Sequence, residues 1–267
     1  MNNLIFLKLG GSLITDKDKP HTVRQDVLDR LAHEISSALI ANPQLRLLIG
    51  HGSGSFGHIP AQKYQTRQQV TTPQQWLGFI EVWREAISLN FLVMKALHQA
   101  GIPAISFSPC AQILAVDGKI NSWDTVQIRS ALIHGLVPVV YGDVIFDSIR
   151  GGTIFSTEEQ FEFLAAEFEP EKILLSGIEP GVWKDYPERK EIIPTITPAT
   201  IGSVDKILNG SASPDITGGM QSKVHTMINL VEKRLCHEVI IFSGMEPGLV
   251  AAVLSGQKAG TRLCQNS

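Results

Sequence analysis

The sequence predicts an α/β fold in which a mainly parallel sheet is covered by helices on both faces. Short runs rich in Ile, Val and Leu alternate with longer segments whose apolar residues recur every three or four positions. Continuously apolar strands are typical of parallel sheets that are buried on both sides. Neither a linker nor a low-complexity tract interrupts the 267 residues. We therefore expect one domain, 1–267, with two possible lobes, about 1–150 and about 151–267.

The individual elements follow from this alternation. Turn-forming residues at Gly118-Lys119 and at 147–152 predict hairpins, and therefore some antiparallel pairing. The long segment 73–100 carries a broad apolar stripe of Trp76, Phe79, Ile80, Trp83, Ile87, Phe91 and Met94. Strands are predicted at 4–7, 45–49, 104–106, 137–141, 172–175 and 239–242, and helices at 23–40, 73–100, 125–134, 158–168 and 220–235.

Composition excludes several classes of protein. The chain is 43% hydrophobic, so it is not of the disordered class, and its net charge of −3 argues against a dedicated nucleic-acid binder. No apolar run reaches the roughly 18 residues of a membrane span, and no signal peptide is recognisable at the start. Three widely spaced cysteines (110, 236 and 264) indicate neither a disulfide framework nor a zinc knuckle. We expect a cytoplasmic protein.

Glycines and charges gather in four predicted turns, at 8–17, 51–58, 142–158 and 215–223, where ligands of such sheets usually bind. In the first, Lys8 interrupts an apolar strand, which is costly unless the side chain meets an anion or a polar cavity. The adjoining Gly10-Gly11-Ser12 can present backbone N–H groups to a phosphate, and Lys17 could return to the same place. An edge-strand lysine beside a simple turn is the alternative.

The second turn fits G-x-G-x-x-G at Gly52–Gly57. A dinucleotide site would also need an acidic residue at the end of the next strand, and the nearest, Glu81, falls inside a predicted helix. The P-loop pattern fails as well, because His58 stands where its lysine would be. What remains is a glycine-rich anion cradle followed by an imidazole, or a flexible loop beside a capping histidine.

The other two turns add carboxylates and a third lysine. Asp143 directly follows a strand, where a carboxylate can orient lysines or organise a metal. Glu158 and Glu159 suit the first turn of a helix that Ser156 or Thr157 would cap. Gly218 and Gly219 would open a helix that carries Lys223 one turn inside. Three lysines and a histidine, without a nucleophile–base pair or a metal-ligand cluster, favour phosphoryl transfer.

The motifs Lys8-Leu9-Gly10-Gly11-Ser12 with Lys17, His51-Gly-x-Gly-Ser-Phe-Gly-His58, Tyr141-Gly142-Asp143 and Asp215-x-Thr-Gly-Gly-Met220-x-x-Lys223 resemble the amino acid kinase superfamily. Within it they are most similar to the isopentenyl phosphate kinases. The resemblance implies an open αβα sandwich, ATP and Mg²⁺ as cofactors, and a homodimer. It also implies a small-molecule monophosphate as substrate, with isopentenyl phosphate converted to isopentenyl diphosphate.

The resemblance also implies roles for residues. Lys8 and Lys223 would contact the transferred phosphoryl group, Lys17 would stabilise the transition state, and His58 would hold the substrate phosphate. Ser53, Gly54 and Thr157 would lie on the substrate side, and Phe79, Val82, Trp83 and Ala86 beside an isoprenoid tail. Metal ligands are not assigned. The nucleotide side would comprise Lys8, Gly10, Gly11, Ser12, Gly54, Ser55, Gly181, Gly218, Gly219 and Lys223.

Three departures from the family pattern leave alternatives open. Ser53 replaces a usual glycine, residues 156–159 replace Ser-Gly-Asp-Asp, and residues 176–182 replace Thr-Asp-x-Asp-Gly-Val. Glu158 could serve for the missing aspartate with a longer reach. A fosfomycin-type phosphonate kinase is the nearest alternative. A nicotinamide-dependent dehydrogenase and a nucleotide-binding regulator without catalysis are less favoured.

Overall fold

The computed structural model describes residues 3–208 and 219–266. At its centre is one large, mainly parallel sheet. All neighbouring strands in it are parallel except β11 and β12. The predicted sheet is therefore confirmed. Its strand order is β10 (Thr195–Ile196), β12 (Thr261–Cys264), β11 (Glu238–Ser243), β9 (Lys172–Gly177), β1 (Leu4–Leu9), β2 (Arg46–His51), β6 (Val137–Tyr141) and β3 (Ala104–Ser106).

A second, four-stranded sheet contains the two predicted hairpins. Its order is β5 (Lys119–Trp123), β4 (Ile113–Val116), β7 (Asp143–Asp147) and β8 (Gly151–Phe155). Both hairpins are antiparallel, whereas β4 and β7 run parallel. The Asp147 carboxylate accepts hydrogen bonds from the N–H groups of Gly118 and Arg150, at 2.6 and 2.8 Å, and so joins the two hairpin turns.

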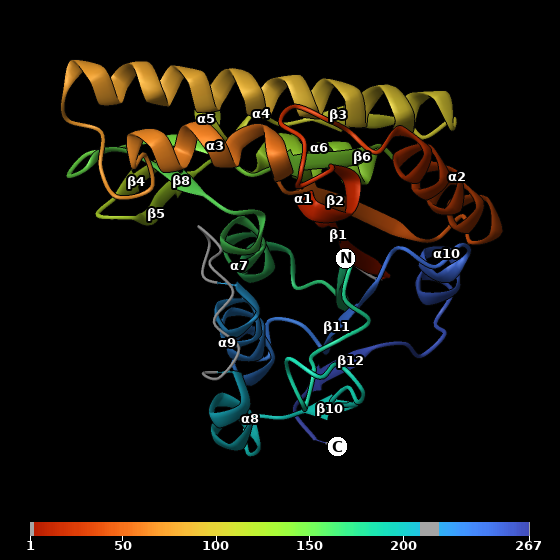
Figure 1. Cartoon of the computed structure of the whole chain (residues 1–267). Helices are drawn as coiled ribbons and strands as arrows, with labels where there is room; N and C mark the ends of the chain where they lie inside the picture. Colours follow the sequence, from red (N-terminus) through yellow and green to blue (C-terminus); the bar gives the residue numbers. More distant parts are fainter. Residues whose placement is uncertain (1–2, 209–218, 267) are drawn as a thin grey trace.

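Helices cover both faces of the large sheet (Figure 1). One face packs on α1 (Gly11–Ile14), α2 (Gln25–Ala41), α4 (Pro73–Gln99) and α10 (Leu249–Leu254). The other packs on α6 (Val126–Ile133), α7 (Thr157–Phe168), α8 (Ile201–Leu208) and α9 (Gly219–Glu232). Alternate residues of β1 show the division, since Leu7 belongs to the first core and Phe6 to the second. This is the expected αβα sandwich.

The sequence did not predict α3 (Gly54–Tyr64), which packs along α4, nor the short α5 (Pro109–Gln112). Glycines at 54 and 57 and a proline at 60 made the segment resemble a loop. Gly54 has φ +51 and lies at the start of the helix, where a glycine adopts that conformation most readily. Helix α3 thus begins inside the second predicted turn, 51–58.

The stripe predicted on α4 is partly wrong. The buried face contains Phe79, Val82 and Leu89, whereas Ile80 is 54% exposed and Phe91 67% exposed. The helix is apolar on two sides, and periodicity alone cannot tell which side meets the sheet.

A small third cluster lies apart from the two main cores. It consists of Ala61 of α3, Phe79 and Val82 of α4, Val144 of β7 and Val70. The partly buried Trp76, Cys110 and Ile154 pack against it. We call it the small apolar cluster.

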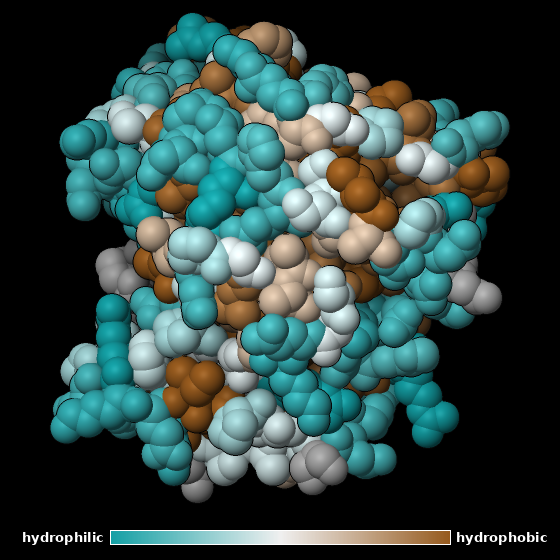
Figure 2. Space-filling model, turned by 90° about the vertical axis from the view of Figure 1, so that its right-hand side faces the viewer, coloured by the Kyte–Doolittle hydropathy of each residue, from teal (hydrophilic) through white to brown (hydrophobic). Residues whose placement is uncertain are grey.

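Figure 2 views the side of the molecule on which α2 and α10 lie, and hydrophilic side chains predominate there, with hydrophobic ones in small separate groups. Within the described residues, no helix is long and apolar enough to cross a bilayer.

Candidate active site

The glycine turns meet at one edge of the large sheet because the central strands are parallel and in register. Leu9 at the end of β1 pairs with His51 at the end of β2 and with Ser176 of β9. His51 in turn pairs with Tyr141 at the end of β6. The turns that follow these strands therefore lie side by side, as the topology predicts.

The first two glycine turns touch backbone to backbone. A Cβ atom on Gly11 would lie 2.4 Å from the Gly54 nitrogen, so neither turn has room for a side chain there. Thr15 fastens the contact: its hydroxyl donates to the Gly11 carbonyl at 2.7 Å and accepts the Ser55 N–H at 3.0 Å. The pattern of glycines and lysines did not reveal Thr15, although its place four residues after Gly11 is where a helical turn would bring it back.

Lys8 of β1 points to the start of α7, where its Nζ forms an ion pair with Glu158. Both side chains are nearly buried. Burial opposes the charge of Glu158, but the charges of Lys8 and Lys223 outweigh it and lower the pKa of Glu158 to about 2. Lys8 of β1 thus pairs with this carboxylate, and Lys223 of α9 lies near enough for its charge to act on it. Of the two glutamates at the start of α7, Glu159 has the predicted capping role, because its side chain accepts the Ser156 N–H at 2.8 Å. Glu158 is the partner of Lys8 instead.

His51 lies beneath this pair as a neutral, buried ring. It stacks on Tyr141 with 5.4 Å between ring centroids, and its Nε2 lies 3.2 Å from Asn90 Oδ1. Burial lowers the pKa of His51 to about 4, and the positive charge of Lys8 acts in the same direction. Because His51 is uncharged at neutral pH, it adds no positive charge to this edge of the sheet.

Asp143 is buried where β6 passes into β7. One carboxyl oxygen accepts the Val144 N–H at 2.8 Å, and the other, buried Oδ2 has no hydrogen-bond partner among the residues that the structure describes. Burial raises the pKa of Asp143 to about 8, against the opposing effect of hydrogen bonds from the backbone of Val144 and Cys110. That Asp143 orients a lysine or organises a metal stays a prediction.

Lys17 and His58 flank the same two turns. Lys17 is exposed on the loop 16–22, which a bridge between Thr15 and Val23 closes. His21 attaches that loop to α4, because its Nδ1 lies 2.6 Å from Oε2 of the buried Glu85. His58 is half-buried in the second turn of α3.

Several predicted contacts are used within the protein. The Gly10 N–H donates to the Ser176 carbonyl at 2.8 Å, and the Ser55 N–H is taken by Thr15. The Thr157 side chain is buried, and its hydroxyl donates to the His51 carbonyl at 2.7 Å. These groups shape the turns, whereas Gly11, Ser12 and Gly54 remain the predicted backbone donors.

The remaining predicted residues are spread around the edge. Gly181 packs on β12, since a Cβ there would lie 2.6 Å from Thr261 Oγ1. Gly219 opens α9 with φ +63, and Gly218 lies outside the described residues. Ser53 is the N-cap of α3, with its hydroxyl close to Gly57. Trp83, 39% exposed, does not belong to the small apolar cluster that contains Phe79.

Two hollows in the surface lie away from this edge. They have volumes of about 310 and 520 Å³ and are lined by residues at the opposite, amino ends of the strands, such as Arg46 of β2 and Lys172 of β9. Ligands of doubly wound sheets bind at the carboxyl ends. The glycine edge is therefore the candidate site.

The described part of the chain brings together no group of three or more His, Cys, Asp or Glu side chains able to hold a metal. Mg²⁺ in kinases is usually carried by nucleotide phosphates with only one or two carboxylates.

The fold and the glycine edge define a phosphotransferase of the αβα type. The chain belongs to the amino acid kinase family, whose model matches residues 3–243. Within that family it is similar to the isopentenyl phosphate kinase of Methanothermobacter thermautotrophicus, with 35% identity over 97% of this chain and 98% of the relative. The isopentenyl phosphate kinase of Methanocaldococcus jannaschii is 32% identical over 97% and 98%. A solved isopentenyl phosphate kinase structure superimposes with a TM-score of 0.82 and 32% identity, covering 97% and 99%.

Proposed function

We propose that this chain is a kinase that transfers the γ-phosphoryl group of ATP to the phosphate of isopentenyl phosphate, giving isopentenyl diphosphate and ADP. The observation that carries the proposal is the direct contact of the two glycine turns at Gly11 and Gly54, with Lys8 on the strand that leads into the first turn. Two anion cradles that touch suit a reaction between two phosphate groups. The likeness to isopentenyl phosphate kinases supports the choice of acceptor.

The nucleotide side would be formed by the turn 10–12 together with Lys8 and Lys223. The ion pair of Lys8 with Glu158 supports this role, because the carboxylate holds the ammonium group in place before ATP arrives, and the charge of Lys223 acts on the same carboxylate. Mg²⁺, carried by the ATP phosphates, would offset their charge. Gly181, Gly218 and Gly219 would complete the nucleotide side in the second lobe, about 151–267.

The acceptor side would be formed by Ser53, Gly54 and His58 in the first lobe, about 1–150. His58 would donate to the acceptor phosphate. Ala61, one helical turn further along α3, belongs to the small apolar cluster with Phe79 and Val82. An isoprenoid tail that leaves a phosphate at His58 would therefore run toward apolar side chains. A small polar phosphonate has no use for that cluster, which disfavours the fosfomycin-type alternative.

In the reaction, an oxygen of the acceptor phosphate attacks the γ-phosphorus while the bond to the β–γ bridging oxygen breaks, and ADP leaves. Charge spreads over the oxygens of the transferred group, so positioning and electrostatic stabilisation supply the catalysis. Lys8 and Lys223 would stabilise that charge from the nucleotide side, and Lys17 from the exposed loop 16–22.

A coupled assay of ADP release tests the proposal with isopentenyl phosphate, dimethylallyl phosphate, fosfomycin and simple alkyl phosphates as acceptors. We expect the highest kcat/KM for isopentenyl phosphate. Turnover of fosfomycin alone would favour the phosphonate kinase, and ATP binding without turnover of any acceptor would favour the regulator.

The cationic residues provide a second test. His58→Ala and Lys17→Ala should each lower kcat/KM severely, by about 100-fold or more. The thermal unfolding temperature of Lys17→Ala should be unchanged, because Lys17 is exposed. Kinetics near those of the wild type for both purified variants would overturn the mechanism.

We further propose a homodimer and a cytoplasmic location. An exposed apolar row on α4, which includes Leu77, Ile80 and Phe91, supports association with a second copy. Light scattering of a Phe91→Glu variant tests this, since a charge in the interface should give monomers. The three cysteines form no disulfide, which suits a reducing compartment.

A further inference from the structure

The turn between β11 and α10, residues 244–248, lies directly beside the first glycine turn. The Gly244 N–H donates to the Gly177 carbonyl at 2.8 Å. A Cβ on Gly244 would lie 2.2 Å from Ser176 Oγ and 2.5 Å from a methyl carbon of Leu13. Ser176 also accepts the Gly10 N–H through its carbonyl. A shift of the turn 244–248 toward β9 would therefore displace Ser176 and Leu13, which adjoin the turn 10–12.

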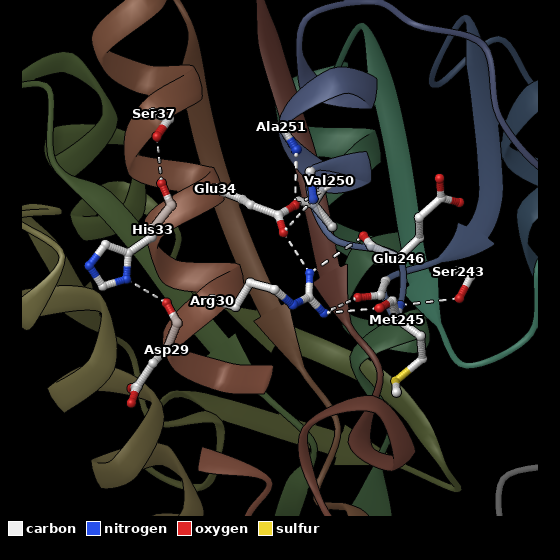
Figure 3. A network of polar contacts seen from close by, with 12 residues as sticks. Asp29, Arg30, His33, Glu34, Ser37, Ser243, Met245, Glu246, Val250 and Ala251 are labelled. Carbon is white, nitrogen blue, oxygen red and sulfur yellow. Dashed lines mark hydrogen bonds and ion pairs between the residues drawn. The ribbon is translucent and has the colours of Figure 1, made fainter. Parts of the chain in front are cut away.

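Arg30 of α2 holds the first part of this turn (Figure 3). Its guanidinium donates to the Gly244 carbonyl at 2.6 Å, and more weakly to the carbonyls of Met245 and Glu246, both at 3.5 Å. Three successive carbonyls thus face one planar cation. The planar fork of an arginine suits this, whereas a lysine would present a compact point charge without that fixed geometry.

Glu34, one helical turn further along α2, holds the end of the turn. Its carboxylate is buried and accepts the N–H groups of Gly248 at 2.9 Å and Val250 at 3.0 Å, as well as the Arg30 guanidinium at 2.5 Å. Gly248 is the N-cap of α10 and has no side chain to cap it. Glu34 therefore supplies from another helix the cap that α10 lacks.

We propose that Arg30 and Glu34 are positioning residues for the nucleotide side of the site. Arg30 and Glu34 hold the two ends of the turn 244–248 by hydrogen bonds and so keep Gly244 in contact with Ser176 and Leu13. That contact keeps the turn 10–12 in the shape that accepts nucleoside triphosphate. The inference rests on the proposed function. It assigns the pair to the nucleotide side because Gly244 lies against Ser176 and Leu13, and both of these adjoin the turn 10–12.

The test measures ADP binding by calorimetry without acceptor, and the KM values for ATP and isopentenyl phosphate, in Arg30→Met and Arg30→Lys. Asp29→Ala is the matched control, because on the same helix the one described hydrogen bond of its carboxylate is with the exposed Gln25 amide, at 2.7 Å. We expect Arg30→Met to raise the ADP Kd and the KM for ATP about ten-fold, with the KM for isopentenyl phosphate within about two-fold. Arg30→Lys should fall between Arg30→Met and the wild type, and Asp29→Ala should match the wild type.

Glu34→Gln guards against a folding defect, since it keeps the size of the side chain and one acceptor oxygen. It should move the ADP Kd in the same direction by a smaller factor. The stabilisation of each variant by saturating ADP in thermal unfolding gives a second readout that does not depend on turnover.

Unchanged ADP affinity in Arg30→Met, or an equal rise in both KM values, would overturn the inference while leaving the proposed function intact. A wild-type protein that binds no ADP at millimolar concentration would instead overturn the proposed function, and this inference with it.

Discussion

Two parts of the candidate site are built in different ways. The turns at Gly11 and Gly54 are shaped by backbone packed on backbone, where a Cβ would come within 2.4 Å of a neighbouring nitrogen. The turn 244–248 is shaped by Arg30 and Glu34 from a helix more than 200 residues earlier in the chain. The spacing of glycines in the sequence predicts the turns at Gly11 and Gly54. The sequence around 244–248, in contrast, does not indicate that Arg30 and Glu34 hold this turn.

The largest effect is expected from filling the backbone contact. Gly11→Ala must part the two turns, so turnover should fall about 100-fold, and the free energy of unfolding should drop by about 1–3 kcal/mol. Gly202→Ala is the control, because a Cβ there, in α8, meets nothing within 4 Å. Steady-state kinetics and urea unfolding of both variants test this, and wild-type kinetics in Gly11→Ala would show that the contact is not needed.

The variant Glu158→Gln removes the negative charge beside Lys8 and keeps the size of the side chain. We expect kcat to fall about ten-fold, because Lys8 loses its ion-pair partner and Lys223 loses a nearby opposite charge. The pKa of Glu158 is lowered from 4.5 to about 2, so its contribution to stability is present above pH 4.5 and lost as the pH falls toward 2. The difference in free energy of unfolding between wild type and variant should therefore shrink below pH 4.5 in urea titrations. A difference that is constant from pH 7 to pH 3 would contradict the assignment.

Asp143→Asn should have a smaller effect, with the opposite dependence on pH. The pKa of Asp143 is raised from 3.8 to about 8, so the folded protein holds a proton that the unfolded chain releases between these values. Wild-type stability should thus fall steadily, relative to the variant, as pH rises from about 4 to 8. Unfolding titrations at pH 5 and pH 8 measure it, and equal differences at both would refute the buried, protonated carboxyl.

The smallest effect is expected from releasing the loop that carries Lys17. His21→Gln weakens the 2.6 Å contact with Glu85, so kcat should fall about three-fold while the KM for ATP stays unchanged. Lys19→Ala is the control, because its only described ion pair, with Asp16 at 3.9 Å, is exposed. If kcat is the same in both variants, the loop does not need this attachment.

The sequence predicted most of the regular elements, and the misses have physical reasons. The strands β3 and β6 were predicted with the observed bounds, since short apolar runs between turn residues leave little choice. Helix α3 was missed because its glycines and Pro60 lower helix propensity, and packing against α4 outweighs them. The buried side of α4 was misjudged because Ile80 and Phe91 are as apolar as Leu89.

By itself, the sequence determined what depends on neighbours along the chain. The glycine pairs, the lysine within an apolar strand and the alternation of strands and helices placed the turns at one edge of a parallel sheet. Only the tertiary structure decided that Lys8 pairs with Glu158, that Thr15 joins two turns, and that α2 holds the turn after β11 by hydrogen bonds. Such pairings depend on burial and on distances of a few ångströms between residues far apart in the chain. The charges and hydrogen bonds gain their strength only once folding has excluded water around them.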